Sequence, residues 1–287
     1  MDSKILSIVN LQGKTAYNPT SPIEFDRKRY LGLRVESLES ETDTQTLFAY
    51  ERQQGNILAI DYSINSLPLQ DPTFAIIKGY TLMSGVKVWE ENEGIKWRQD
   101  FYIGDSIRSL EYLCSGPVGM KDTRLVELED RIGVFTRPQG KIGVKGKIGY
   151  MVIGKVDELK TLTEVDWYSG KIIEMLFNGD QWVGVNQAIR LPEDKIGVIG
   201  HIAHQTTNRN GVLEKHYYAL SFVFNSKTRM HSGFSIIARR NDFPPSPSKR
   251  SPELDDVIFP AGIDEENYLY CGLSDFCVGK KKIKKLF

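Results

Sequence analysis

The sequence predicts an all-β fold, and three observations indicate it. Most segments that could be regular structure are short, rich in Val, Ile, Tyr, Phe and Thr, and interrupted by Gly, Asn or Asp. No stretch has the periodicity of a long amphipathic helix. A cassette of polar loop, strand, tight turn and second strand recurs about five times, which is typical of radial β arrays. In such an array equivalent loops meet near one axis, so their polar residues are expected to converge on one pocket.

The composition sets limits on fold and partners. The chain has 287 residues, enough for one large all-β domain or two small ones. Hydrophobic residues make up 40%, which suffices for a core. Lys plus Arg and Asp plus Glu both total 37, so net charge gives no reason to expect nucleic acid or an anionic membrane as a partner.

The cysteines and the chain ends bear on location. Cys114, Cys271 and Cys277 form no CxxC pair and leave one unpaired in any disulfide scheme, so we expect small buried thiols in a reducing compartment. Neither an apolar signal core nor an apolar run long enough for a membrane span is seen. These features predict a cytoplasmic protein. The basic tail 280–285 is expected to be a solvated terminal strand or extension.

The sequence also predicts the local structure of several individual segments. Residues 86–89 and 217–224 alternate like strands, and 140–150 is predicted to be a strand kinked by glycines. The Pro-rich stretch 243–248 is interpreted as a surface connection inside one domain, because the last cassette is too small to fold alone. Strands from both termini would complete one sheet and remove an open edge.

The five cassettes place polar residues at comparable points. They begin with Asn18-Pro19-Thr20-Ser21-Pro22, Gln70-Asp71-Pro72-Thr73, Lys121-Asp122-Thr123-Arg124, Asn186-Gln187-Ala188-Ile189-Arg190 and Asp256-Val257-Ile258-Phe259-Pro260. Taken in order, they resemble the five-bladed β-propeller glycosidase superfamily. Within it they resemble glycoside hydrolase family 130, the β-mannoside phosphorylases and hydrolases, and more narrowly the domain-of-unknown-function 1861 group. The resemblance implies a single five-bladed β-propeller over residues 1–287 with a central active-site pocket.

The first and last cassettes resemble sugar-holding loops. Tyr17-Asn18-Pro19 with Arg34 matches the family's first motif, and Tyr270-Cys271-Gly272-Leu273-Ser274-Asp275 matches its last. The resemblance implies that Asn18, Arg34 and Asp275 bind the sugar in the cleaved subsite. Read without the family, Asn18-Pro19 is a turn, Arg34 a surface strand residue and Asp275 a solvated loop residue.

The second cassette supplies the candidate acid. The family motif is Glu-Asp-Pro-Arg with its Asp as proton donor, and here the segment is Gln70-Asp71-Pro72-Thr73. Asp71 is retained while the flanking Glu and Arg are replaced. Glycoside cleavage needs a carboxylic acid that still holds a proton for the leaving oxygen. Taken alone, Asp-Pro before a strand is an ordinary turn.

The third and fourth cassettes supply cations. The resemblance implies that Lys121 and Asp122 bind the substrate. It also implies that the attacking phosphate or water is faced by Arg137, Arg190, His201 and Tyr217. Gly119-Met120 replaces an Arg-Asn pair that helps to hold phosphate in the phosphorylases. His201 and His204 lack a clear third ligand and make a weak metal pair. We therefore expect no metal and no cofactor. The sequence leaves open whether inorganic phosphate is a co-substrate.

The resulting hypothesis is an inverting glycoside-cleaving enzyme that acts on a β-mannoside-like oligosaccharide or glycoconjugate. Phosphorolysis and hydrolysis both stay open; for hydrolysis, Asp122 and Glu127 are the candidate bases. The alternative is a non-catalytic carbohydrate-binding propeller. A protein-interaction scaffold is a third interpretation, although its repeats are usually more regular. The expected partner is an oligosaccharide or glycoside, without nucleic acid or membrane, and a homo-oligomer stays open.

Overall fold

The computed structural model describes residues 3–11, 13–37, 40, 42–52, 56–92, 94–174 and 179–287. Within these ranges the chain is built almost entirely of β-strands, which confirms the all-β prediction. The helices are short: α1 (Gly140–Gly143), α2 (Glu164–Tyr168) and the 3-10 turns η1 (Val156–Lys160) and η2 (Arg240–Asp242). None of the described helices is long and apolar enough to cross a membrane.

The strands pair into successive antiparallel runs. The first run is β2 (Thr15–Pro19), β4 (Lys28–Glu36), β5 (Thr44–Glu51) and β6 (Ile57–Ile60), with β3 (Ile23–Phe25) on β4. The second is β7 (Gln70–Ile77), β8 (Tyr80–Glu91), β9 (Gly94–Gly104) and β10 (Glu111–Ser115). The third is β11 (Arg124–Glu127), β12 (Ile132–Thr136), β13 (Gly149–Ile153) and β14 (Lys171–Ile172). The fourth is β15 (Trp182–Arg190), β16 (Lys195–Thr207), β17 (Leu213–Asn225) and β18 (His231–Ala238).

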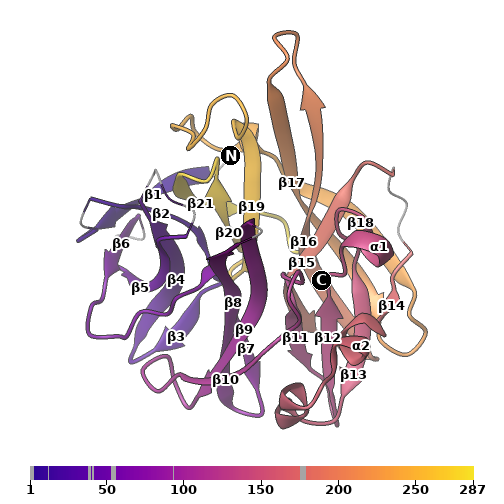
Figure 1. Cartoon of the computed structure of the whole chain (residues 1–287). Helices are drawn as coiled ribbons and strands as arrows, with labels where there is room; N and C mark the ends of the chain where they lie inside the picture. The colour runs from indigo at the N-terminus through magenta and orange to yellow at the C-terminus, as the bar shows by residue number, and fades with distance from the viewer. Residues whose placement is uncertain are drawn as a thin grey trace.

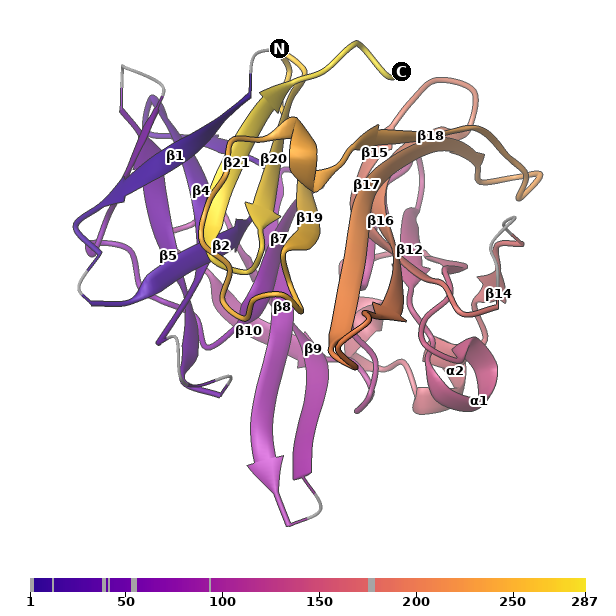
Figure 2. The same cartoon turned by 90° about the horizontal axis from the view of Figure 1, so that it is seen from above.

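The last run uses both ends of the chain. It consists of β19 (Asp256–Ile263), β20 (Tyr268–Leu273), β21 (Cys277–Lys282) and β1 (Ser3–Val9). Strand β1 pairs antiparallel with β21 through its first half, and its second half runs parallel to β6. Figure 2 shows the N-terminal strand beside the C-terminal ones. The expected pairing of strands from the two termini is confirmed.

The first strands of the runs are neighbours. β2 lies beside β7, β7 beside β11, β11 beside β15, β15 beside β19, and β19 beside β2. The runs therefore stand around the molecule with these strands toward its middle (Figure 1). This arrangement brings the starts of the cassettes together.

Aromatic side chains fill the space between neighbouring runs. Tyr150 of β13 packs edge-on against Phe224 of β17, with ring centroids 4.7 Å apart, and Phe135 of β12 lies 5.0 Å from Tyr150. All three rings are fully buried. Large aromatic groups contribute much of the hydrophobic stabilisation of such packing. These rings pack the third run against the fourth.

The predicted strand at 140–150 is wrong for its first part. Helix α1 and a loop occupy residues 140–148, and β13 begins only at Gly149. A Cβ on Gly143 would lie 1.8 Å from the carbonyl oxygen of Pro138, and one on Gly146 would lie 2.7 Å from Arg137 Nη2. These glycines let the loop fold tightly over Pro138 and Arg137, and do not mark kinks in a strand.

The expectation of a solvated basic tail is wrong for two lysines. Lys280 and Lys281 are 5% and 8% exposed. Lys280 Nζ pairs with Glu51 Oε1 at 2.8 Å, and Lys281 Nζ with Asp242 Oδ2 at 2.8 Å. The reason is that β21 is an interior strand between β20 and β1 and that carboxylates receive both lysine side chains, Glu51 on one face of the sheet and Asp242 on the other.

Other expectations hold. The strands predicted at 86–89 and 217–224 lie within β8 and β17. All three cysteines are free; Cys114 and Cys271 are buried, and Cys277 is half-buried. The prolines of 243–248 are exposed, as expected of a surface connection, whereas Phe243 packs into the core.

Candidate active site

Polar residues within or next to the central strands have an unusual backbone. Asn18, Asp71 and Asp122 have positive φ values of 42°, 45° and 58°, and Asp275, in the turn from β20 to β21, has 48°. Asn and Asp tolerate this left-handed conformation better than most residues. The strand register also shifts at Tyr17/Pro19 and at Gln70/Thr73. Such bulges re-aim side chains and are common next to active sites.

A polar cavity of about 230 Å³ lies beside Asn18, Asp71 and Asp275. Its lining residues are Asn18, Arg34, Gln70, Asp71, Lys121, Lys215, Tyr217, Lys249, Arg250, Leu254, Val257, Phe259 and Asp275. Larger hollows exist elsewhere, for example one of about 510 Å³ beside Phe25 and Ile107. The smaller cavity is the candidate site because the strained Asn and Asp positions meet there. It contains Asn18, Arg34, Asp71, Lys121, Tyr217 and Asp275 of the predicted site residues.

Asp71 is held through one of its two oxygens. Its Oδ1 accepts a hydrogen bond from Asn18 Nδ2 at 2.7 Å and another from Arg34 Nη1 at 3.2 Å. Its Oδ2 receives no donor from the residues that the structure describes. The carboxyl group is therefore oriented, with one oxygen left for a proton or a ligand. Asn18, Arg34 and Asp71 come from two different runs and form one unit.

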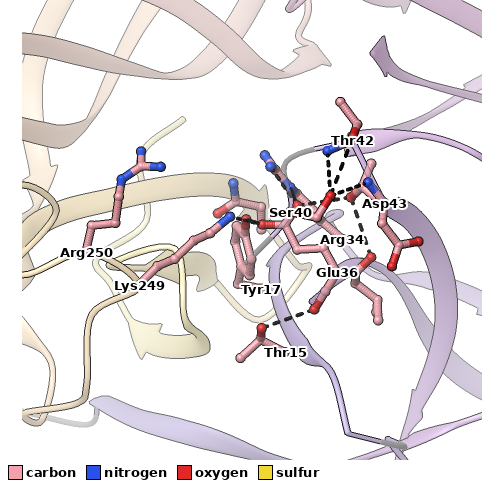
Figure 3. A network of polar contacts seen from close by, with 12 residues as sticks. Thr15, Tyr17, Arg34, Glu36, Ser40, Thr42, Asp43, Lys249 and Arg250 are labelled. Atoms are coloured by element: carbon pink, nitrogen blue, oxygen red, sulfur yellow. Dashed lines mark hydrogen bonds and ion pairs between the residues drawn. The ribbon is translucent and has the colours of Figure 1, made fainter. Parts of the chain in front are cut away.

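Glu36, which the sequence analysis missed, fixes the other side of Arg34. Glu36 is fully buried, and its Oε2 accepts from Arg34 Nε at 3.0 Å and Nη2 at 2.8 Å. Its Oε1 accepts from Tyr17 Oη and Lys249 Nζ (Figure 3). A buried carboxylate needs such partners. The available signal was a charged pair two residues apart on one face of β4, whose neighbouring Leu31, Leu33 and Val35 are apolar.

Asp275 lies in a different environment from Asp71. No hydrogen bond to its carboxyl group is made by the described residues. Burial raises its pKa; the negative charges of Asp71 and Glu36 add to the rise, while Arg34 and Lys249 oppose it. The environment of Asp275 therefore favours the protonated form of its carboxyl group.

A second buried cluster lies beside the cavity around Asp122. Arg137 Nη1 is 3.0 Å from Asp122 Oδ2, and Arg124 Nη2 is 3.7 Å from Oδ1, with each side chain 4% exposed. Burial alone would raise the pKa of Asp122, but Arg137, with Lys121 and Arg124, lowers it to about 2. Asp122 is thus a permanent anion that offsets only one of three neighbouring cations.

His201 is a neutral member of this cluster. Its Nδ1 lies 2.8 Å from Asn186 Oδ1, and its ring packs against Tyr217 and Phe259. Burial lowers the pKa of His201 to about 3. A Cβ on Gly184 would lie 2.5 Å from His201 Cε1, so this glycine makes room for the ring. His201 can give or accept a hydrogen bond at neutral pH but brings no charge.

Two residues that the sequence suggested for the site, Arg190 and Glu127, lie away from the cavity. Arg190 is exposed at the end of β15 and does not line the cavity. A bulge between Val185 and Gln187 makes Asn186 the inward residue of that strand. Glu127 lies at the far end of β11, where it accepts the backbone N–H of Lys78 at 2.6 Å. Neither residue is brought to Asp71.

The sequence also missed cations of the cavity wall. Lys215 comes from β17, and Lys249 and Arg250 come from the connection before β19. No repeat of the cassette marks them. His204, three residues after His201, instead stacks on His216 with ring centroids 4.7 Å apart. The described residues contain no group of three or more His, Cys, Asp or Glu side chains that could hold a metal ion.

Comparison with solved structures finds two similar proteins of Leishmania mexicana. MPT-4, a mannose phosphorylase in complex with phosphate ion, is 28% identical with a TM-score of 0.88, and the match covers 99% of this chain and 87% of that one. MPT-1, a GDP-Man-dependent mannosyltransferase, is 30% identical with a TM-score of 0.89, covering 100% and 90%.

A glycosyl hydrolase from Bacteroides ovatus, 14% identical with a TM-score of 0.61, shares the fold over 96% of this chain and 87% of that one. None of the curated proteins matches the sequence. The family described as "Protein of unknown function (DUF1861)" matches residues 1–287, the whole sequence. The chain therefore belongs to the DUF1861 family.

Proposed function

We propose that this protein is an inverting mannoside phosphorylase whose active site is the cavity around Asp71. The observation that carries the proposal is an excess of positive charge next to an oriented carboxyl group. Lys121, Arg124 and Arg137 surround Asp122, which leaves two positive charges without a carboxylate in that cluster. An oxyanion suits such a site. The similarity to a mannose phosphorylase with bound phosphate supports this assignment.

Asp71 is proposed as the proton donor. Asn18 and Arg34 hold its Oδ1, so its Oδ2 is the oxygen that would carry the proton. Phosphate attacks the anomeric carbon, the bond from that carbon to the glycosidic oxygen breaks, and the proton reaches the leaving oxygen. The products are mannose 1-phosphate and the free alcohol. Inversion requires phosphate and leaving group on opposite faces of the sugar.

Lys121 is proposed to bind the phosphate. It lines the cavity and makes no hydrogen bond or ion pair with the described residues, although it acts electrostatically on Asp122. Tyr217 lines the same cavity, and its Oη accepts from Trp182 Nε1 at 3.1 Å, which leaves its own hydroxyl hydrogen for a ligand. The neutral His201 ring stacks on Tyr217 at 5.7 Å, and the positive charge of Arg137 acts on the Tyr217 hydroxyl.

Hydrolysis fits the site less well because it needs a base to activate water. Asp122 is bound by Arg137 and has a pKa of about 2, which makes it a weak base. Glu127 accepts from Lys78 at the far end of its strand. Phosphate needs no protein base, so phosphorolysis is the reaction that the charges favour.

The fold belongs to the same proposal. We propose a five-bladed β-propeller that β1 and β21 close, with the active site at its centre. The neighbour relations of β2, β7, β11, β15 and β19 support this proposal. The whole of residues 1–287 would then be one domain.

The reaction can be tested in the direction of synthesis. The protein is incubated with mannose 1-phosphate and a panel of neutral sugars, and released inorganic phosphate is measured. We expect release that depends on an acceptor, and a KM for mannose 1-phosphate about 10-fold higher in Lys121→Met, since one charge-assisted contact is lost. Lys171→Met, at an exposed lysine, is the matched control. A protein that binds these sugars without turning any over would contradict the proposal.

A further inference from the structure

The turn between β20 and β21 holds Asp275 at the cavity on a strained backbone. Ser274 and Asp275 are consecutive and have positive φ values of 52° and 48°. This left-handed conformation is unfavourable for residues other than glycine, and it persists only where surrounding contacts hold it. Asp71 is held by donors to its own side chain, whereas no described residue hydrogen-bonds to the carboxyl group of Asp275. The position of that carboxyl group therefore depends on the backbone of the turn.

Ser274 is the point at which this turn is held. It is 1% exposed, its N–H donates to Val257 O at 2.9 Å, and its carbonyl oxygen accepts from the Lys249 N–H at 3.0 Å. Its hydroxyl donates to Asp255 O at 3.4 Å and accepts from Arg240 Nε at 3.0 Å. Among these contacts, only the one from Arg240 comes from a charged side chain. Hydrogen bonds from a charged donor are the stronger kind.

Arg240 is a buried cation whose hydrogen bonds go to neutral acceptors. It lies in η2, it is 9% exposed, and its other nitrogens donate to Pro244 O at 3.0 Å and to Ser246 Oγ at 2.7 Å. None of the carboxylates that the structure describes forms an ion pair with it. A buried guanidinium without a paired anion is costly. Its contacts join the Pro-rich connection to the turn that carries Asp275, and this joint is what the buried charge provides.

Arg240 itself lies outside the cavity, because it is not among the lining residues. Its connection to the site runs through a single residue: Arg240 bonds to Ser274, and Asp275 follows directly in the chain. A change at Arg240 would therefore reach the cavity as a displacement of the Asp275 carboxyl group.

We propose that Arg240 is a positioning residue, which fixes Asp275 against the mannosyl group through its hydrogen bond to Ser274. This inference rests on the proposed function, since that function places a mannosyl group beside Asp275. The acceptor sugar lies on the other side of the bond that forms. Arg240 should therefore affect the binding of the mannosyl donor and leave the binding of the acceptor unchanged.

The test begins with the synthesis assay, in which mannose 1-phosphate and the acceptor are varied separately. Arg240→Gln should raise the KM for mannose 1-phosphate about 10-fold, with the KM for the acceptor unchanged. A smaller folded fraction lowers the maximal rate but does not alter KM. Arg209→Gln, at an exposed arginine, is the matched control. If Arg240→Gln does not fold, Ser274→Ala removes the same hydrogen bond and should raise the same KM.

A double variant separates positioning from general support of the fold. The dissociation constant for mannose 1-phosphate is measured by calorimetry in Arg240→Gln, Asp275→Asn and the double variant, so that no turnover is needed. Both single variants should bind more weakly than the parent. Because Arg240 acts only through Asp275, the double variant should bind no more weakly than Asp275→Asn alone.

Each result decides the inference. An unchanged KM and dissociation constant in Arg240→Gln, in an active enzyme, would overturn the inference alone. Additive losses in the double variant would show that Arg240 supports the fold without acting through Asp275, and would also overturn it. If the parent binds mannose 1-phosphate but transfers no mannose, the proposed function fails, while non-additive losses in binding would still support the role of Arg240. A parent that does not bind mannose 1-phosphate would overturn both.

Discussion

At the scale of single residues, the orientation of Asp71 depends on donors that come from another run. Asn18 and Arg34 bond to the same oxygen of Asp71, and Glu36 holds Arg34 from behind. Each of these contacts limits how the carboxyl group can turn. The left-handed backbone at Asn18 and Asp71 is part of the same arrangement.

Replacing Asp71 tests its role as the acid. Asp71→Asn should lower the rate on a substrate with a sugar leaving group by about 10²–10⁴-fold, because a general acid contributes that much. A p-nitrophenyl mannoside should lose far less, since its leaving group needs little protonation. Asp130→Asn, at an exposed residue, is the control. An equal loss with both leaving groups would argue against proton donation by Asp71.

Replacing Glu36 tests the buried ion network. Glu36→Gln should lower the free energy of unfolding by roughly 3–5 kcal/mol, because Arg34 and Lys249 lose the charge that compensates them. The double variant Glu36→Gln/Lys249→Met should recover part of this loss. Urea denaturation measures both. A single variant as stable as the parent would mean that the network contributes little.

The neutral state of His201 makes stability depend on pH. In the unfolded chain His201 takes up a proton near pH 6.5, while in the folded protein it stays neutral down to a pKa of about 3. The unfolded state therefore binds more protons between these values, and stability falls as the pH drops through this window. His201→Gln should reduce the slope by up to about 1.4 kcal/mol per pH unit. Unfolding curves between pH 4.5 and 6.5 give the slopes, and identical slopes would contradict this account.

At the scale of elements, bulges decide which side chains enter the cavity. The cassette pattern correctly brought Asn18, Asp71 and Lys121 to one cavity, because each lies in or just before a central strand, β2, β7 or β11. It failed for Arg190, because the bulge at Asn186 changes which residue faces inward. Alternation along a strand cannot show a bulge, so this part of the site was not predictable.

The close contact between β20 and β2 also helps to position a side chain of the site, Asn18. A Cβ on Gly272 would lie 1.8 Å from Asn18 Oδ1. Gly272→Ala should push Asn18 away from Asp71 and lower kcat/KM, with a loss of stability of about 1–3 kcal/mol from overpacking. Gly179→Ala, where an added Cβ meets nothing within 4 Å, is the control. Full activity in Gly272→Ala would show that the bond from Asn18 is not needed.

At the scale of the whole molecule, the site depends on contacts between distant parts of the sequence. Glu36 and Lys249 are 213 positions apart, and no local pattern of residues encodes their meeting. The all-β class, the cassettes and the pairing of the terminal strands could be predicted, since they follow from strand composition and from the need to cover edges. Lys249 and Arg250 of the cavity wall could not, because they lie in the connection before β19, outside the repeat. The family is described as one of unknown function, so the proposed reaction rests on the charges of the site and on the similarity to a mannose phosphorylase.

Product analysis in the direction of cleavage distinguishes phosphorolysis from hydrolysis. The protein is incubated with a β-mannoside, with and without inorganic phosphate, and the products are identified by ³¹P and ¹H NMR. We expect α-mannose 1-phosphate, formed only when phosphate is present. Free mannose, released at the same rate without phosphate, would contradict it.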